Sequence, residues 1–184
     1  MDFRTEWAGW NDLPVAREGH TGKYINYQAL LFETVKELKP TNILEIGFNA
    51  GHSACCFLNA YPSAKMVTFD ICRHGTEDAA LQALQPHFDI TLVRGDSVET
   101  VPKYLKENDT LFDFVFIDGL HLGKHPYLDF MNTKDRIAPG GIIVVDDMDV
   151  GTVPSCFAKV NWSGFGEIKV RSQIEKRIKI LRKN

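Results

Sequence analysis

The fold of this chain is decided by the stretch Ile43-Leu44-Glu45-Ile46-Gly47-Phe48-Asn49-Ala50-Gly51-His52-Ser53. A short apolar run ends at Gly47, and a second glycine, Gly51, precedes a segment with helical spacing. Glycine permits sharp turns and lets the backbone approach a ligand closely. The pattern predicts a strand, a ligand-binding loop and a helix in that order, although any strand–turn–helix unit also favours glycine.

The spacing of the glycines indicates which ligand such a loop could bind. A dinucleotide fingerprint requires G-x-G-x-x-G, in which the second glycine admits the pyrophosphate. Here Gly47 and Gly51 stand four residues apart, and the acidic Glu45 precedes them. Because an acid at the end of the strand suits a cationic group, we expect a positively charged ligand rather than a dinucleotide.

Apolar runs and segments of helical spacing alternate along the rest of the chain. Strands are expected at 42–47, 65–71, 90–93, 112–117 and 142–145, and helices at 27–38, 53–59, 76–84, 98–106 and 127–136. Strands that alternate with helices in this way form a parallel sheet with right-handed crossovers. The sequence therefore predicts an α/β fold with a doubly wound sheet, and a turn at Pro139-Gly140-Gly141.

The two ends of the chain are less regular. Residues 1–26 are expected to form an N-terminal arm and candidate lid, and residues 27–184 the ligand-binding domain. The arm carries Trp7 and Trp10, for which packing onto the body is the commoner role. Runs at 166–173 and 177–183 predict a terminal antiparallel hairpin, whose many basic residues are typical of a solvated edge.

Composition narrows the class of protein. The chain has 184 residues, 44% of them hydrophobic, which suits one domain. Its net charge of -3 weighs against nucleic-acid binding and favours a small-molecule partner. The cysteines form no C-x-x-C pair and lie beside apolar runs, which indicates reduced thiols in a cytoplasmic protein. No apolar stretch is long enough to span a membrane, so no membrane association is expected.

Polar residues also end the second and third strands. Asp70 ends the second, where a carboxylate can accept hydrogen bonds from ribose hydroxyls, and Asp96 and Ser97 follow the third. Each alone is weak evidence, because aspartate often ends a strand or caps the next helix. Ligands of doubly wound sheets lie across successive carboxyl edges, so the series predicts one shared site.

On these motifs the chain resembles the class I S-adenosylmethionine (SAM)-dependent methyltransferases over roughly residues 21–147. The matching segments are 45–51, Asp70, 95–97, 114–119 and 139–147. The resemblance implies a Rossmann-like, three-layer fold with a seven-stranded, mostly parallel sheet of order 3-2-1-4-5-7-6. It also implies SAM as cofactor, with the methionine part at Glu45, Gly47, Asn49 and Gly51, the ribose at Asp70, and the adenine at Asp96 and Ser97.

The fourth and fifth strands end in Asp118 and in Asp146-Asp147. Three carboxylates in one pocket repel one another. We therefore expect that either one of them takes up a proton or a hard cation such as Mg²⁺ binds. The resemblance extends to small-molecule O-methyltransferases. Catechol- and caffeoyl-CoA-type enzymes hold a divalent metal here with an acid and an Asp-Asn pair, from which this Asp-Asp departs. The macrocin and cephalosporin-hydroxylase-like group carries Ile-Asp-Gly-x-His, as residues 117–121 do.

That resemblance implies a metal bound by Asp118, Asp146 and Asp147, with Asp118 also touching the cofactor. The alternative is that Asp146 caps a helix and Asp147 faces solvent. His121 stands where catechol-type enzymes carry the residue that takes the substrate proton, so His121 and Asp118 are the expected catalytic residues. A histidine that only hydrogen-bonds Asp118 is the alternative. A zinc site with His125 is disfavoured, because an intervening glycine interrupts helix geometry.

The expected reaction is metal-assisted O-methylation of a hydroxyl on a small molecule or sugar. N-methyltransferases usually carry Asn or Asp, then Pro-Pro and an aromatic residue after the fourth strand, where this chain has Asp118-Gly119-Leu120-His121. A SAM-binding module or partner subunit without catalysis is another alternative. No large insertion encloses an acceptor, so we also expect a homodimer that completes the site.

Overall fold

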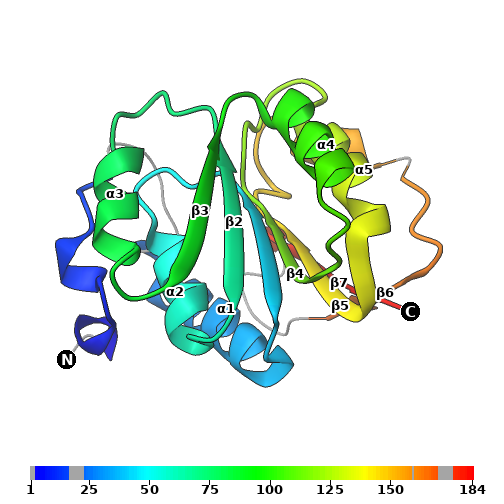
Figure 1. The fold of residues 1–184 in the computed structure, drawn as a ribbon. Coiled ribbons are helices and arrows are strands. Elements are labelled where there is room, and N and C mark those ends of the chain that lie inside the picture. Colours follow the sequence, from blue (N-terminus) through cyan, green and yellow to red (C-terminus); the bar gives the residue numbers. More distant parts are fainter. Residues whose placement is uncertain (1–2, 17–22, 159, 170–175) are drawn as a thin grey trace.

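The computed structural model describes residues 3–16, 23–158, 160–169 and 176–184 and contains one seven-stranded sheet (Figure 1). The strand order is β3-β2-β1-β4-β5-β7-β6, as predicted. The bounds are β1 Asn42–Ile46, β2 Lys65–Asp70, β3 Asp89–Arg94, β4 Phe112–Ile117, β5 Ile137–Val145, β6 Phe165–Ile168 and β7 Lys179–Lys183. Strands β1 to β5 pair in parallel, whereas β7 runs antiparallel to both β5 and β6.

Helices cover both faces of the sheet (Figure 1). One layer contains α1 (Ile25–Leu38), α2 (His52–Ala60) and α3 (Glu77–Leu84), and the other α4 (Ser97–Glu107), α5 (His125–Thr133) and α6 (Val153–Phe157). Alternate strand residues serve separate cores: Ile43 packs with the first layer and Leu44 with the second. Burial on both faces accounts for continuous apolar runs such as that of β4. No helix among the described residues is long and apolar enough to cross a membrane.

Local structure differs from expectation in the second half of the chain. The turn predicted at residues 139–141 is wrong, because these residues belong to β5, and a register shift between Phe112 and Phe114 of β4 accommodates them. Strand β7 is not a solvated edge: it lies between β5 and β6 and buries Ile180 and Leu181. The predicted hairpin strand at 166–173 is described only to residue 169.

The described part of the N-terminal arm packs against α1 and α2. It contains two 3₁₀ turns, Phe3–Glu6 and Trp10–Asp12. The Trp7 ring stacks on Phe32 of α1, with centroids 5.2 Å apart. The Ala8 backbone N–H donates to Asn59 Oδ1 of α2 over 2.9 Å. A lid role for the arm stays a prediction, and residues 1–2 and 17–22 of it lie outside the described residues.

Candidate active site

A cavity of about 720 Å³ opens at the carboxyl ends of β1 to β4. Backbone hydrogen bonds hold neighbouring strand ends together, from Gly47 N to Phe69 O over 2.8 Å and from Asp118 N to Ile46 O over 2.8 Å. The predicted site residues that line the cavity are Gly47, Asn49, Asp70, Asp96, Ser97, Asp118 and His121. Residues that lie far apart in the sequence therefore face one space.

The loop after β1 needs glycine for two reasons. Gly47 has a φ of 98°, and a Cβ atom there would lie 2.0 Å from the carbonyl oxygen of Asp118. Asn49 also has a positive φ, 47°, and asparagine tolerates this conformation better than most residues. Its Oδ1 accepts a hydrogen bond from Thr76 Oγ1 over 3.1 Å. The loop backbone is thus held close to the end of β4.

Glu45 and Gly51 were also predicted to contact the ligand, but neither lines the cavity. Glu45 is fully buried and accepts hydrogen bonds from Ser53 Oγ over 2.5 Å and Thr68 Oγ1 over 2.7 Å. Burial raises the pKa of Glu45 to about 8, and the two hydroxyls only partly oppose it. Glu45 therefore contributes to the loop after β1 through buried hydrogen bonds to Ser53 and Thr68, and it does not face the cavity.

Asp70 ties the first two strand ends together. Its Oδ2 accepts hydrogen bonds from the backbone N–H groups of Phe48 over 2.8 Å and Asn49 over 2.9 Å. Its Oδ1 accepts from Cys72 N over 2.6 Å. A carboxylate offers about four lone-pair positions, so the group can still accept a hydrogen bond from a ligand.

Asp96 caps α4 at the adjacent strand end. Its Oδ1 accepts a hydrogen bond from Val98 N over 3.0 Å, and its Oδ2 lies 3.5 Å from His125 Nε2. His125 therefore faces Asp96 and takes no part in a cluster with His121. Ser97, the first residue of α4, lines the cavity beside it.

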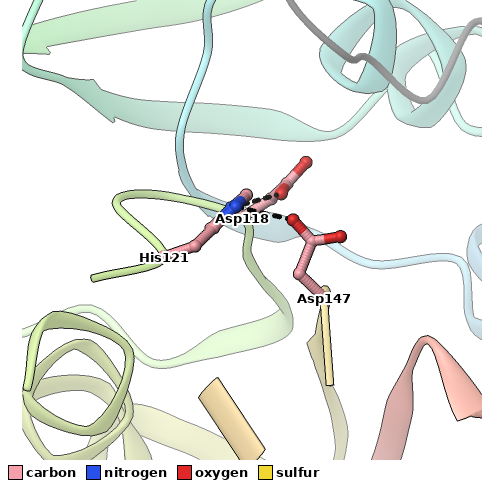
Figure 2. A group of neighbouring side chains, drawn as sticks. All are labelled: Asp118, His121 and Asp147. Atoms are coloured by element: carbon pink, nitrogen blue, oxygen red, sulfur yellow. Dashed lines mark hydrogen bonds and ion pairs between the residues drawn. The ribbon is translucent and has the colours of Figure 1, made fainter. Parts of the chain in front are cut away.

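His121 lies between two carboxylates (Figure 2). Its Nε2 is 3.2 Å from Asp118 Oδ1 and its Nδ1 is 2.7 Å from Asp147 Oδ2. Burial alone would lower the pKa of His121, but hydrogen bonds and charge from both aspartates raise that pKa to about 10. Burial would likewise raise the pKa of Asp147, but the hydrogen bond and charges of its cationic neighbours lower it. Burial raises the pKa of Asp118, and the hydrogen bond and charge of His121 oppose this shift. The arrangement of the three groups therefore favours the protonated imidazole.

The structure separates Asp146 from the other two predicted metal ligands. Its side chain is 0% exposed, with Oδ1 2.9 Å from Arg177 Nε and Oδ2 3.1 Å from Arg177 Nη2. The ligand atoms that do cluster come from Asp118, His121 and Asp147 and lie within 4.8 Å of one another. Asp147 is not solvent-facing, since its side chain is only 8% exposed. The third member of the cluster is therefore His121, whereas Asp146 was predicted.

Sequence reasoning missed Arg177. It was assigned to a basic, solvated hairpin, and no spacing in the sequence links it to Asp146. The register of β7 against β5, in which Lys179 pairs with Val145, brings the segment before β7 beside the acidic pair. Sequence reasoning also gave no role to Ile71 and Leu120, two partly exposed apolar residues that line the cavity.

Comparison with known proteins identifies the family and the fold of the chain. A family model described as a methyltransferase domain matches residues 44–148, and the chain belongs to this methyltransferase family. A search of curated proteins found no match.

Solved structures resemble the whole fold. An O-methyltransferase from Bacillus cereus in complex with SAH has 16% identity and a TM-score of 0.69, over 95% of this chain and 86% of that one. The O-methyltransferase TomG from Streptomyces achromogenes, in complex with SAM, has 18% identity and a TM-score of 0.66, over 94% and 82%. A TDP-rhamnose 3'-O-methyltransferase of calicheamicin biosynthesis has 21% identity and a TM-score of 0.69, over 90% and 80%.

Proposed function

We propose that this protein is a SAM-dependent methyltransferase that methylates a hydroxyl of a small molecule or sugar. The observation that carries the proposal is the single cavity shared by the Gly47 loop, Asp70, Asp96 and His121. Family membership supports methyl transfer. Similar structures named as O-methyltransferases, two of them in complex with SAH or SAM, support this choice of cofactor and acceptor group.

The cavity suits the parts of SAM from one end to the other. The loop at Gly47 and Asn49 would hold the methionine part, and the remaining lone pair of Asp70 would accept a hydrogen bond from a ribose hydroxyl. Asp96 and Ser97 would form hydrogen bonds with the polar edge of the adenine. Ile71 and Leu120, 40% and 41% exposed, offer apolar surface that a flat base can cover.

A divalent cation fits the cluster of Asp118, His121 and Asp147 chemically. Two carboxylate oxygens and one imidazole nitrogen suit Mn²⁺ or Mg²⁺, and their spread of 4.8 Å allows one ion to reach all three. When bound, such an ion would polarise the acceptor hydroxyl as a Lewis acid. A bound ion would replace the proton on the ring nitrogen that it binds, so His121 can be either a metal ligand or an imidazolium between the two aspartates, but not both.

The residues of the chain supply proton removal and positioning. In the form without the ion, neutral His121 would accept the proton of the acceptor hydroxyl as its oxygen attacks the methyl group of SAM and SAH is released, and Asp118 and Asp147 would stabilise the imidazolium that forms. A base with a pKa of about 10 is strong enough for a phenol-like hydroxyl but is mostly protonated at neutral pH. We therefore expect methyl transfer to become faster as the pH rises above neutrality.

Isothermal titration calorimetry with SAM and SAH, followed by transfer of labelled methyl from SAM to a panel of hydroxyl compounds, tests the proposal. We expect SAM binding and transfer to at least one hydroxyl. The variant His121→Ala should lose transfer and bind SAM within about threefold of the wild type. Absence of SAM binding contradicts the proposal, and SAM binding without transfer to any hydroxyl favours a non-catalytic module.

A further inference from the structure

Arg177 is held in place on three sides. Its guanidinium lies against Asp146 and Asp147, with Nη2 2.9 Å from Asp147 Oδ1. Its Cζ lies 5.3 Å from the ring centroids of both Tyr24 and Tyr27, at the start of α1. Its backbone carbonyl accepts a hydrogen bond from Met148 N over 2.7 Å. The strand-end loop that carries both aspartates is thus bound to Arg177 through side chain and main chain.

The two aspartates need such a cation. Asp146 is fully buried and Asp147 nearly so, and adjacent buried carboxylates are costly unless a charge compensates them. Arg177 provides that charge through a planar fork, which suits carboxylates better than a lysine does. Among the described residues, no other lysine or arginine has an ion pair with either aspartate.

The contacts also divide the carboxylate oxygens between two neighbours. Asp147 directs Oδ1 to Arg177 and Oδ2 to His121, so Arg177 sets the orientation in which Asp147 meets the imidazole. Asp146 directs both oxygens to Arg177, and its Oδ1 also accepts from Asp147 N over 2.7 Å. Asp146 therefore has no oxygen directed at the cluster of Asp118, His121 and Asp147.

We propose that Arg177 is a positioning residue that acts as an internal cation for the Asp146–Asp147 pair. It keeps Asp146 out of the coordination shell of a divalent ion at Asp118, His121 and Asp147. The inference rests on the metal site in the proposed function. It does not depend on the acceptor or on SAM.

Mn²⁺ binding to the full-length protein without SAM tests this inference, measured by calorimetry and by the electron paramagnetic resonance signal of free Mn²⁺. Asp146→Asn should keep Mn²⁺ affinity within about threefold of the wild type, whereas Asp147→Asn should weaken binding more than about tenfold. Arg177→Gln should strengthen binding about tenfold or more, because it removes a nearby positive charge and frees Asp146. A residue with a merely structural role would not raise Mn²⁺ affinity when lost.

Controls separate charge from folding. Arg136→Gln removes an arginine paired with Asp109, away from the cavity, and should leave Mn²⁺ binding unchanged. The double variant Arg177→Gln/Asp146→Asn should lose the gain seen with Arg177→Gln alone. Should Arg177→Gln fail to fold, Asp146→Asn against Asp147→Asn still decides whether Asp146 is a ligand.

Three outcomes would overturn the inference. These are a loss of more than about tenfold in Mn²⁺ affinity with Asp146→Asn, no gain with a folded Arg177→Gln variant, and no Mn²⁺ binding by the wild type. SAM calorimetry and methyl transfer in the presence of EDTA, run on the same preparations, report on the proposed function separately.

Discussion

At the scale of single residues, Gly47 connects two strand ends. A Cβ atom there would lie 2.0 Å from the Asp118 carbonyl oxygen, and the φ of 98° is itself unfavourable for alanine. We expect Gly47→Ala to lower the free energy of unfolding by about 2 kcal/mol or more, and to weaken SAM binding. Urea unfolding and calorimetry measure both effects.

The control for that variant is Gly75→Ala. Gly75 also has a positive φ, 74°, but a Cβ atom there would meet no described residue within 4 Å beyond its chain neighbours. Its substitution should cost only about 1 kcal/mol from backbone strain and leave the approach of β1 to β4 intact. Equal effects of the two substitutions would show that the contact with Asp118 is unimportant.

His121 offers a second prediction at this scale. Asp118 and Asp147 raise its pKa to about 10, so an NMR titration of its ring should show a midpoint near that value. Because the folded pKa exceeds the unfolded one, the protonated ring stabilises the protein fully below about pH 6.5, and this stabilisation is lost as the pH rises towards 10. Asp118→Asn should lower the midpoint, since one of the two carboxylates is removed. A midpoint near the ordinary histidine value in the wild type would contradict the geometry.

At the scale of elements, α4 illustrates how one residue can serve both a helix and a site. Asp96 caps α4 through a hydrogen bond from Val98 N and also lines the cavity. We expect Asp96→Ala to lower the free energy of unfolding by about 1 kcal/mol, because the cap is lost. Asp96→Asn keeps a capping oxygen and should restore most of this stability, as thermal unfolding can measure.

The same pair of variants separates the cap from the ligand contact. If Asp96 binds adenine through its charge or acceptor pattern, the asparagine variant should be stable yet bind SAM more weakly. Normal SAM binding by both variants would remove Asp96 from the proposed cofactor contacts.

Elements were predictable to different degrees. The strands from β1 to β4 were expected within one or two residues, because apolar runs and glycine turns are local signals. The first half of β5 was not expected, and local pattern assigned the residues of β7 to a solvated edge, although the family resemblance predicted β7 between β5 and β6. Pro139 and two glycines are typical of a turn, and only the irregular pairing with β4 allows them inside a strand.

At the scale of the whole molecule, the arm is expected to stabilise the body. Trp7 stacks on Phe32, and no described residue of the arm lines the cavity. Trp7→Ala should lower the free energy of unfolding by about 2 kcal/mol and change SAM affinity less than about threefold. Val15→Ala, at a residue that is 89% exposed, is the control and should alter neither quantity. A large loss of SAM affinity with Trp7→Ala would instead favour a lid.

The order of strands and helices, the loop at Gly47 and the acidic strand ends could be derived from local pattern, since periodicity and turn chemistry act over a few residues. The partners of those acids could not. Three features depend on sheet register and on packing between distant segments. They are the pairing of Arg177 with Asp146, the position of His121 between Asp118 and Asp147, and the burial of Glu45. Such contacts cannot be recognised from the spacing of residues in the sequence. The chain between the two partners can fold back in many ways, and only the packing of the core selects one conformation.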